Sequence, residues 1–153
     1  MPDVGENAPD FTLPSTEGTS KSLNDYAGQT LILFFYPKDN TSGCTKEAVG
    51  FSEALAQFKD LGATVVGVSK DSMTSHEKFV TKHDLKVELL SDENGTLCED
   101  FDVWKEKSMY GKTYMGIERS TFVMDGTGKI THAWRKVRVP GHVDTVLETL
   151  KNG

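Results

Sequence analysis

Apolar and polar positions follow two different periods along this chain. Residues 31–36 form an unbroken apolar run, Leu-Ile-Leu-Phe-Phe-Tyr, which ends at Pro37. A run that is apolar on both faces is typical of a central parallel strand covered on each side. After a turn-like segment at residues 38–43, apolar residues recur at helical spacing: Ala48, Phe51, Leu55, Phe58 and Leu61. Gly62 then supplies a helix stop. The pattern predicts a buried strand followed by an amphipathic helix.

A second strand and helix are predicted downstream. Residues 64–68 indicate the strand, and Ser72 can cap a helix that continues to His83. A short helix is expected to hold Leu97, Cys98 and Phe101. The polar, aromatic segment from residue 104 to 117 is expected to be a loop.

The C-terminal third predicts a hairpin and a closing helix. Residues 119–124 and 129–134 flank the turn sequence Asp125-Gly-Thr-Gly128. The closing helix bears four apolar residues at helical spacing: Val143, Val146, Leu147 and Leu150. At the other end of the chain, the first thirty residues are rich in turn formers and offer one short strand candidate, Phe11–Leu13.

This order of elements predicts an α/β, thioredoxin-like fold. Strand–helix–strand units at this spacing require right-handed crossovers and place helices against a central mixed sheet. The first thirty residues form an N-terminal extension, and the segment before residue 119 is a middle insertion. A chain of 153 residues without repeats or linkers is expected to form a single domain, residues 1–153.

Composition narrows the classes of function. The net charge is −6, with no Lys/Arg-rich run, so neither nucleic acid nor an anionic membrane is an expected partner. The longest apolar run is far shorter than the ~20 residues of a membrane span. The N-terminal segment has neither a basic start nor an apolar stretch, so no signal peptide is expected. Two cysteines cannot form a disulfide framework, and free thiols suit a reducing cytosol, so a cytoplasmic location is expected.

Cys44 is the strongest candidate for chemistry. It falls in the first turn of the predicted helix, where unpaired backbone N–H groups and the helix dipole favour thiolate, the nucleophilic form, over thiol. A free cysteine is more often a buried, inert small hydrophobe. However, the polar neighbours of Cys44 argue against a core position. Thr41 and Pro37 complete a P-x-x-x-T-x-x-C pattern, which is more specific than any of its members.

The segment Phe35-Tyr-Pro-Lys-Asp-Asn-Thr-Ser-Gly-Cys-Thr45 resembles the active-site signature of the peroxiredoxins, most closely their Q-type or bacterioferritin comigratory protein subgroup. Further matches run along nearly the whole chain: Gly5-x-x-Ala8-Pro-Asp-Phe11, Leu90-Ser-Asp92, Gly111-Lys-x-Tyr-x-Gly-x-x-Arg-Ser-Thr-Phe122 and the turn at residues 125–130. The resemblance implies a thioredoxin fold that reduces hydrogen peroxide or alkyl hydroperoxides without a metal or bound cofactor.

The same resemblance implies a role for each matching residue. Cys44 would be the peroxidatic cysteine, which attacks the peroxide and becomes a sulfenic acid. Thr41 would hydrogen-bond the peroxide, and Pro37 would wall the pocket against water. Arg119 would lie beside the sulfur, where its permanently charged, planar guanidinium can contact sulfur and peroxide together.

The chain departs from the subgroup at the resolving cysteine. Many Q-type members carry it five residues after the first cysteine, where this chain has Val49. The other familiar place, near Val80, is also without a cysteine. Cys98 remains a candidate resolving residue, although its position between Leu97 and Phe101 favours a packed interior thiol. We therefore expect a one-cysteine mechanism. In it, an external thiol (thioredoxin, glutaredoxin or a small thiol) reduces the sulfenic acid, and a two-cysteine cycle through Cys98 is the alternative.

Other functions remain open from sequence alone. A thioredoxin-fold binding or chaperone module without turnover, a disulfide oxidoreductase and a Cys–His hydrolase are the competing hypotheses. The oxidoreductase would need a C-x-x-C motif, and position 41 is threonine. His76 and His83 lie seven residues apart, which is not the usual helical spacing of metal ligands. The subgroup implies a monomer or a weak homodimer.

Overall fold

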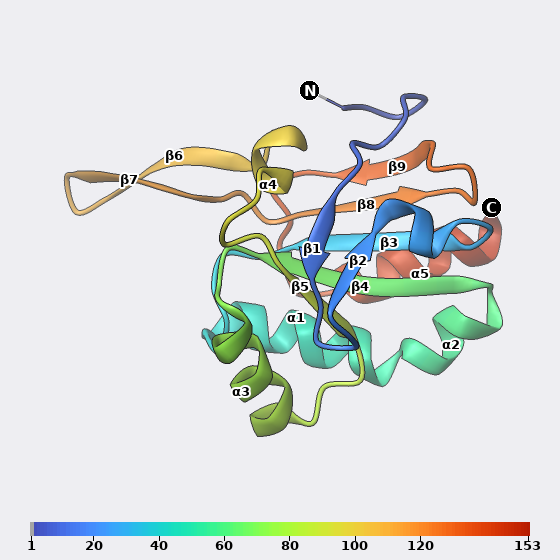
Figure 1. Ribbon diagram of the computed structural model, residues 1–153, viewed down its shortest axis with the longest axis horizontal. Coiled ribbons are helices and arrows are strands. Elements are labelled where there is room, and N and C mark those ends of the chain that lie inside the picture. Colours follow the sequence, from blue (N-terminus) through green and yellow to red (C-terminus); the bar gives the residue numbers. More distant parts are fainter. Residues whose placement is uncertain (1) are drawn as a thin grey trace.

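A five-stranded mixed sheet forms the centre of the structure, a computed structural model that describes residues 2–153 (Figure 1). Its strands, in spatial order, are β5 (Glu88–Ser91), β4 (Ala63–Ser69), β3 (Thr30–Phe35), β8 (Ser120–Met124) and β9 (Ile130–Trp134). The first three are parallel, whereas β8 runs antiparallel to β3 and forms a hairpin with β9. The predicted α/β thioredoxin-like fold is confirmed, with the apolar run at its centre.

Strand β3 divides the molecule into two cores. Successive side chains of a strand point to opposite faces. Leu31, Leu33 and Phe35 accordingly belong to one buried cluster. Ile32, Phe34 and Tyr36 belong to the other. Burial on both faces explains why this segment is apolar at every position.

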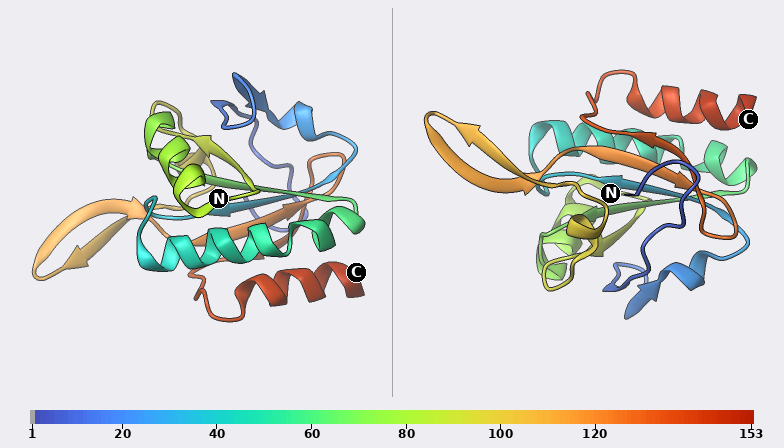
Figure 2. Two further views of the ribbon diagram at one scale, coloured as in Figure 1. Left: turned by 90° about the horizontal axis from the view of Figure 1, so that it is seen from below. Right: turned by 90° about the horizontal axis from the view of Figure 1, so that it is seen from above.

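Different elements cover the two faces of the sheet. On the face with Phe34, the cluster includes buried side chains of four helices: α1 (Ser42–Glu53), α2 (Leu55–Asp60), α3 (Met73–His83) and α5 (His142–Asn152). Figure 2 shows α1 and α5 running side by side on this face. The opposite core is closed by the N-terminal extension, with β1 (Thr12–Pro14), β2 (Ser20–Ser22) and the 3-10 helix η1 (Leu23–Tyr26), and by α4 (Leu97–Asp100). Within residues 2–153, none of the helices is long and apolar enough to cross a membrane.

The single helix expected up to residue 61 is two helices. Ala54, with ψ of 0°, ends α1 and begins α2. Across this break Phe51 and Phe58 both remain buried, with ring centroids 5.9 Å apart. Hydrophobic spacing alone did not reveal the break, because both helices bury the same apolar stripe. The predicted stop at Gly62 is confirmed by its positive φ of 75°.

The expectation of a loop at residues 104–117 is wrong. The segment is an antiparallel hairpin of β6 (Trp104–Met109) and β7 (Lys112–Ile117), which extends away from the sheet (Figure 1). Tyr110 and Gly111 both have positive φ, as a two-residue type I′ turn requires. Most side chains of the two strands are at least partly exposed, so the alternation that marks a half-buried strand is missing.

Strand β5 was also not predicted from the sequence. Its first residue, Glu88, is buried but paired: it accepts hydrogen bonds from Tyr26 (2.8 Å), Lys21 (3.1 Å) and Ser15. These three partners belong to the N-terminal extension. A buried carboxylate therefore fastens the extension to the sheet.

Candidate active site

The loop after β3 leads directly into the first turn of α1. Thr41 is the N-cap of this helix and Cys44 is its third residue, the position predicted for it. The Thr41 hydroxyl donates a hydrogen bond to the Lys38 carbonyl (2.8 Å), and the Thr41 carbonyl accepts the first helical bond, from Thr45 (2.8 Å). The fold thus places the sulfur in a helical turn whose early backbone N–H groups have no helical acceptor.

Cys44 is nevertheless buried, with an exposed fraction of only 1%. The expectation that its polar neighbours would keep it out of the core is wrong. On a helix, consecutive residues point in different directions, so Thr41 and Ser42 face solvent while Cys44 faces the sheet. The residue lies in the cluster that contains Ala48 and Tyr36.

Arg119 brings a cation to this buried sulfur. Its Nη2 donates a hydrogen bond to Cys44 Sγ at 3.3 Å, and its side chain is 16% exposed. The sheet register explains the encounter, because β8 pairs Ser120 with Phe35 at the end of β3. The residue before Ser120 therefore lies beside the loop that begins α1. A guanidinium at this distance stabilises a thiolate more strongly than a neutral thiol.

Glu47 is a site residue that sequence reasoning missed. Its Oε1 accepts a hydrogen bond from Arg119 Nη1 at 2.6 Å, while Oε2 is buried without a protein partner. Burial raises the pKa of Glu47 to about 7, against the opposing attraction of Arg119. Burial alone would lower the pKa of Arg119, but the negative charges of Glu47 and Cys44 outweigh it and raise that pKa. The i, i+3 spacing from Cys44 on one helix was the available signal.

Gly43 gives the guanidinium room to reach the sulfur. A Cβ at this position would lie 3.3 Å from Arg119 Nη2 and 3.9 Å from Val139 Cγ2. A side chain at position 43 would therefore crowd the guanidinium, a steric reason for glycine that the sequence alone does not show.

Pro37 and Thr41 line a groove of about 520 Å³ between the loop and the β6–β7 hairpin. Its apolar lining comes from Trp104, Met109, Tyr114 and Met115, and lysines contribute to its walls. Burial, reinforced by the charge of Arg119, lowers the pKa of one of these lysines, Lys107. The groove therefore combines an apolar lining with positive charge next to two of the predicted site residues.

Cys98 lies in the other core. It is fully buried beside Phe101 and Leu97 on the face opposite to Cys44. Its backbone N–H donates to Asp92 Oδ2 at 2.8 Å. Burial, with a further contribution from the Asp92 carboxylate, raises the pKa of the Cys98 thiol well above its usual range. The structure does not bring the two cysteines together.

The histidines have other partners. His142 bonds Thr121 (2.8 Å), and burial together with the Arg119 charge lowers its pKa to about 4. His83 bonds Asn40, and His76 bonds Asp39 and the Leu90 carbonyl. In the part of the chain that the structure describes, no histidine is hydrogen-bonded to Cys44, so a Cys–His hydrolase gains no support. Asp39, Asp71 and His76 offer metal-ligand atoms within 4.8 Å of one another.

Comparisons with known proteins agree with this fold. Residues 4–133 match the AhpC/TSA family. A putative peroxiredoxin Bcp of Coxiella burnetii is 49% identical over 97% of this chain and 98% of its own length. The crystal structure of a Xylella fastidiosa PrxQ mutant superposes with a TM-score of 0.94, at 44% identity, covering 99% of this chain and 97% of that one.

A third relative has been studied with its chemistry in view. This is the Xanthomonas campestris bacterioferritin comigratory protein, whose alkyl peroxide reduction was investigated with trapped intermediate and ligand complexes. It is 46% identical, with a TM-score of 0.87 over 93% of this chain and 90% of that one. The matched length, the identity to these relatives and the shared fold show that the chain belongs to the AhpC/TSA family, as a peroxiredoxin of the Bcp/PrxQ type.

Proposed function

We propose that the protein is a thiol-dependent peroxidase that reduces hydrogen peroxide and alkyl hydroperoxides, with Cys44 as the attacking nucleophile. The observation that carries the proposal is the guanidinium of Arg119, which contacts Cys44 Sγ at 3.3 Å and Glu47 Oε1 at 2.6 Å. A cation held in this way can stabilise both a thiolate at this position and the negative charge that develops next to it during the reaction.

The proposed first step is a displacement at oxygen. The thiolate attacks one peroxide oxygen, the O–O bond breaks, and the other oxygen leaves as alkoxide or hydroxide, which takes up a proton to become alcohol or water. The sulfur is oxidised to a sulfenic acid. Arg119 and the backbone N–H groups of the first turn of α1 stabilise the leaving oxygen. The Thr41 hydroxyl donates its hydrogen bond to the Lys38 carbonyl, and its oxygen can still accept a hydrogen bond from the peroxide O–H.

The groove next to Thr41 supports alkyl hydroperoxides as substrates. Its Trp104, Tyr114 and Met115 side chains can take up an apolar alkyl group, while Pro37 and Thr41 contribute to the lining from the loop that precedes Cys44. The Xanthomonas campestris relative, studied for alkyl peroxide reduction, supports the same substrate class.

Reduction of the sulfenic acid is proposed to require an external thiol. Cys98 lies in a separate core on the far side of β3 from Cys44. A disulfide needs Cα atoms about 4.4–6.8 Å apart, so pairing would require one cysteine to leave its core. Thioredoxin, glutaredoxin or a small thiol can supply the reductant. A two-cysteine cycle through Cys98 is the alternative.

Mass spectrometry of the intact protein tests both parts of the proposal. After one equivalent of hydrogen peroxide, a one-cysteine enzyme gains about 16 Da, whereas an internal disulfide loses about 2 Da. Cys44→Ser should abolish the mass change and peroxide consumption. Cys98→Ala should retain both the gain and turnover with an external thiol.

Two outcomes would contradict the proposal, each at a different point. Peroxide consumption that survives in Cys44→Ser would exclude Cys44 as the nucleophile. If the wild type loses about 2 Da and Cys98→Ala shows neither this loss nor turnover, Cys98 is the resolving residue.

A further inference from the structure

Asp39 anchors the loop that precedes Cys44. Of the five residues at positions 38–42, Asp39 alone is buried, and the other four are exposed. Whatever holds this loop against the body of the protein therefore acts mainly through one side chain.

That side chain takes part in three hydrogen bonds. Asp39 Oδ1 accepts from the Tyr36 hydroxyl (2.7 Å), and Oδ2 accepts from Ser75 Oγ (2.8 Å) and pairs with His76 Nδ1 (2.6 Å). Its backbone N–H donates to Asp71 Oδ2 at 2.8 Å. Burial and, to a smaller extent, the charge of Asp39 raise the pKa of Tyr36 well above its usual range. The Tyr36 hydroxyl therefore keeps its proton and remains a donor.

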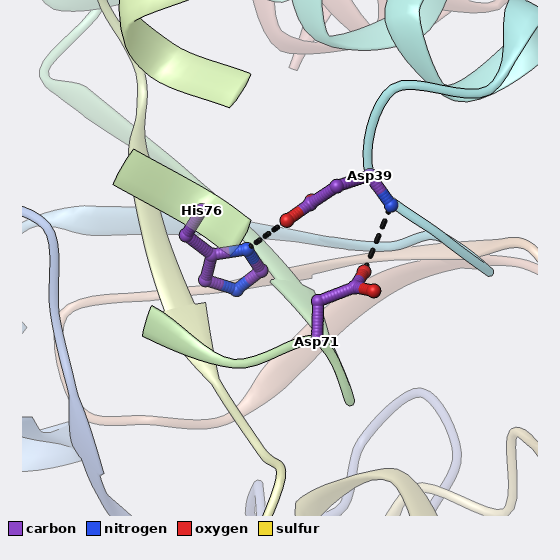
Figure 3. A group of neighbouring side chains, drawn as sticks. All are labelled: Asp39, Asp71 and His76. Carbon is purple, nitrogen blue, oxygen red and sulfur yellow. Dashed lines mark hydrogen bonds and ion pairs between the residues drawn. The ribbon is translucent and has the colours of Figure 1, made fainter. Parts of the chain in front are cut away.

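His76 bonds the same carboxylate (Figure 3) and also bonds strand β5. The ring is fully buried, and its Nε2 lies 2.9 Å from the Leu90 carbonyl, which can only accept. Nε2 therefore carries a proton, and a second proton must lie between Nδ1 and Oδ2, on the ring or on the carboxyl group. Through the Asp39–His76 pair, the loop is attached to helix α3 and strand β5.

The remaining contact between the same helix and loop is exposed. His83 Nε2 lies 2.9 Å from Asn40 Oδ1 in a solvent-exposed pair. Water can replace such a contact at little cost, whereas a buried polar group that loses its partner is strongly destabilising. The two histidines of α3 thus provide a natural comparison between a buried and an exposed contact to one loop.

A metal site is a weaker interpretation of the cluster. The ligand atoms of Asp39, Asp71 and His76 lie close together, but the oxygens and nitrogens concerned already bond one another or Ser69, Ser75, Tyr36 and Leu90. A hydrogen-bonded clamp accounts for them without an additional ion.

We propose that the Asp39–His76 pair is a clamp that keeps the loop closed and thereby positions Thr41 and the first turn of α1, with Cys44, against Arg119. This inference rests on the proposed function, in which the closed arrangement is the one that reacts with peroxide. Since Cys44 is buried in that arrangement, a large thiol reagent reaches it only when the loop opens. Weakening the clamp therefore slows the reaction with peroxide and speeds the labelling of Cys44.

The test measures both rates in the full chain, with Cys98 as an internal reference. N-ethylmaleimide labelling of each cysteine is followed by peptide mass spectrometry, and the peroxide reaction is followed by stopped flow. For Asp39→Ala and His76→Phe we expect Cys44 labelling to rise, and the peroxide rate constant to fall, by about tenfold each. Cys98 labelling, which reports opening of the opposite core, should stay at the wild-type rate.

The matched control is His83→Phe, which keeps a ring against Phe79, removes the exposed bond to Asn40 and should behave like the wild type. Asp39→Asn can still accept from Tyr36 and donate to His76 Nδ1 but no longer accepts from Ser75, so its rates should lie between those of the wild type and Asp39→Ala. Joint acceleration of Cys44 and Cys98 labelling, or unchanged Cys44 labelling in Asp39→Ala, would overturn the clamp. Labelling requires no turnover, so failure of the clamp is distinguishable from failure of the peroxidase proposal, which Cys44→Ser tests.

Discussion

Arg119 makes two contacts that depend on one another. One guanidinium nitrogen faces the Cys44 sulfur and the other faces a Glu47 oxygen, so the carboxylate fixes the orientation in which the cation meets the sulfur. A lysine could make either contact but not both from a planar fork. Glu47 is therefore expected to act on the reaction through Arg119, as a positioning residue.

Glu47→Gln tests this dependence through pH. Burial raises the pKa of Glu47 to about 7, so the wild-type side chain is neutral and resembles glutamine below that pH, and is charged above it. A charged acceptor holds Arg119 more strongly than an amide does. We expect the wild-type peroxide rate constant to exceed that of the variant about fivefold at pH 8 and to approach it at pH 6.

Stopped-flow rate constants between pH 6 and 8 give the ratio directly. A ratio that does not change with pH would show that the charge of Glu47 has no part in holding Arg119.

Sequence reasoning placed some site residues and missed others for a physical reason. Cys44 and Arg119 could be matched to a family pattern. The pairing of the end of β3 with the start of β8 brings them together. Glu47 and Asp39 are charged residues in polar surroundings, and a one-dimensional pattern reads such residues as solvated. Their burial depends on which way the helix and loop turn, and this emerges only in three dimensions.

Among the elements, β4 shows how closely the helical face of the sheet is packed. Gly67 lies in this strand, where an added Cβ would meet Phe34 Cζ at 2.7 Å and Leu89 Cδ2 at 2.8 Å. Both neighbours belong to adjacent strands and are fully buried, so neither can move aside easily. The absence of a side chain at position 67 leaves room for one large side chain from each neighbouring strand.

Gly67→Ala should therefore lower the free energy of unfolding by about 1–3 kcal/mol, the usual cost of overpacking a core. Urea denaturation measures the difference. Gly18→Ala is the matched control, since nothing lies within 4 Å of its added Cβ, and its stability should stay within about 0.5 kcal/mol of wild type. Equal stability of the two variants would mean that the sheet relaxes around position 67.

Elements were predictable where burial left a recognisable apolar pattern in the sequence. The central strand, the 119–134 hairpin and the closing helix all bury an apolar face, and their predictions are confirmed. The β6–β7 hairpin buries little, and its turn is Tyr110-Gly111 rather than the more recognisable Asn-Gly. Its strands are held by backbone pairing, which leaves no trace in hydrophobicity.

At the scale of the whole molecule, His142 links stability to acidity. It lies where α5 begins, against Thr121, and its ring packs near Phe51 and Trp134. Burial and the Arg119 charge lower its pKa to about 4 in the folded protein, whereas an unfolded histidine titrates near 6.5. Between these values the unfolded chain binds the proton and the folded chain does not.

Stability should consequently decline as the pH falls from about 6.5 towards 4. Urea unfolding at pH 7 and pH 5 should show a smaller decline for His142→Gln, which can keep a hydrogen bond to Thr121 but does not titrate. Other titrating groups contribute equally to both proteins. An identical decline in the variant would remove His142 as the source.

The central sheet also separates the two sulfur atoms. With Cys44 in one core and Cys98 in the other, the fold places no second cysteine thiol beside an oxidised Cys44. Under the proposed one-cysteine cycle, recovery would proceed only as fast as thiol molecules arrive from outside. When they are scarce, oxidised protein would accumulate and meet further peroxide, so the share of intact sulfenic acid would report the supply of reducing thiol.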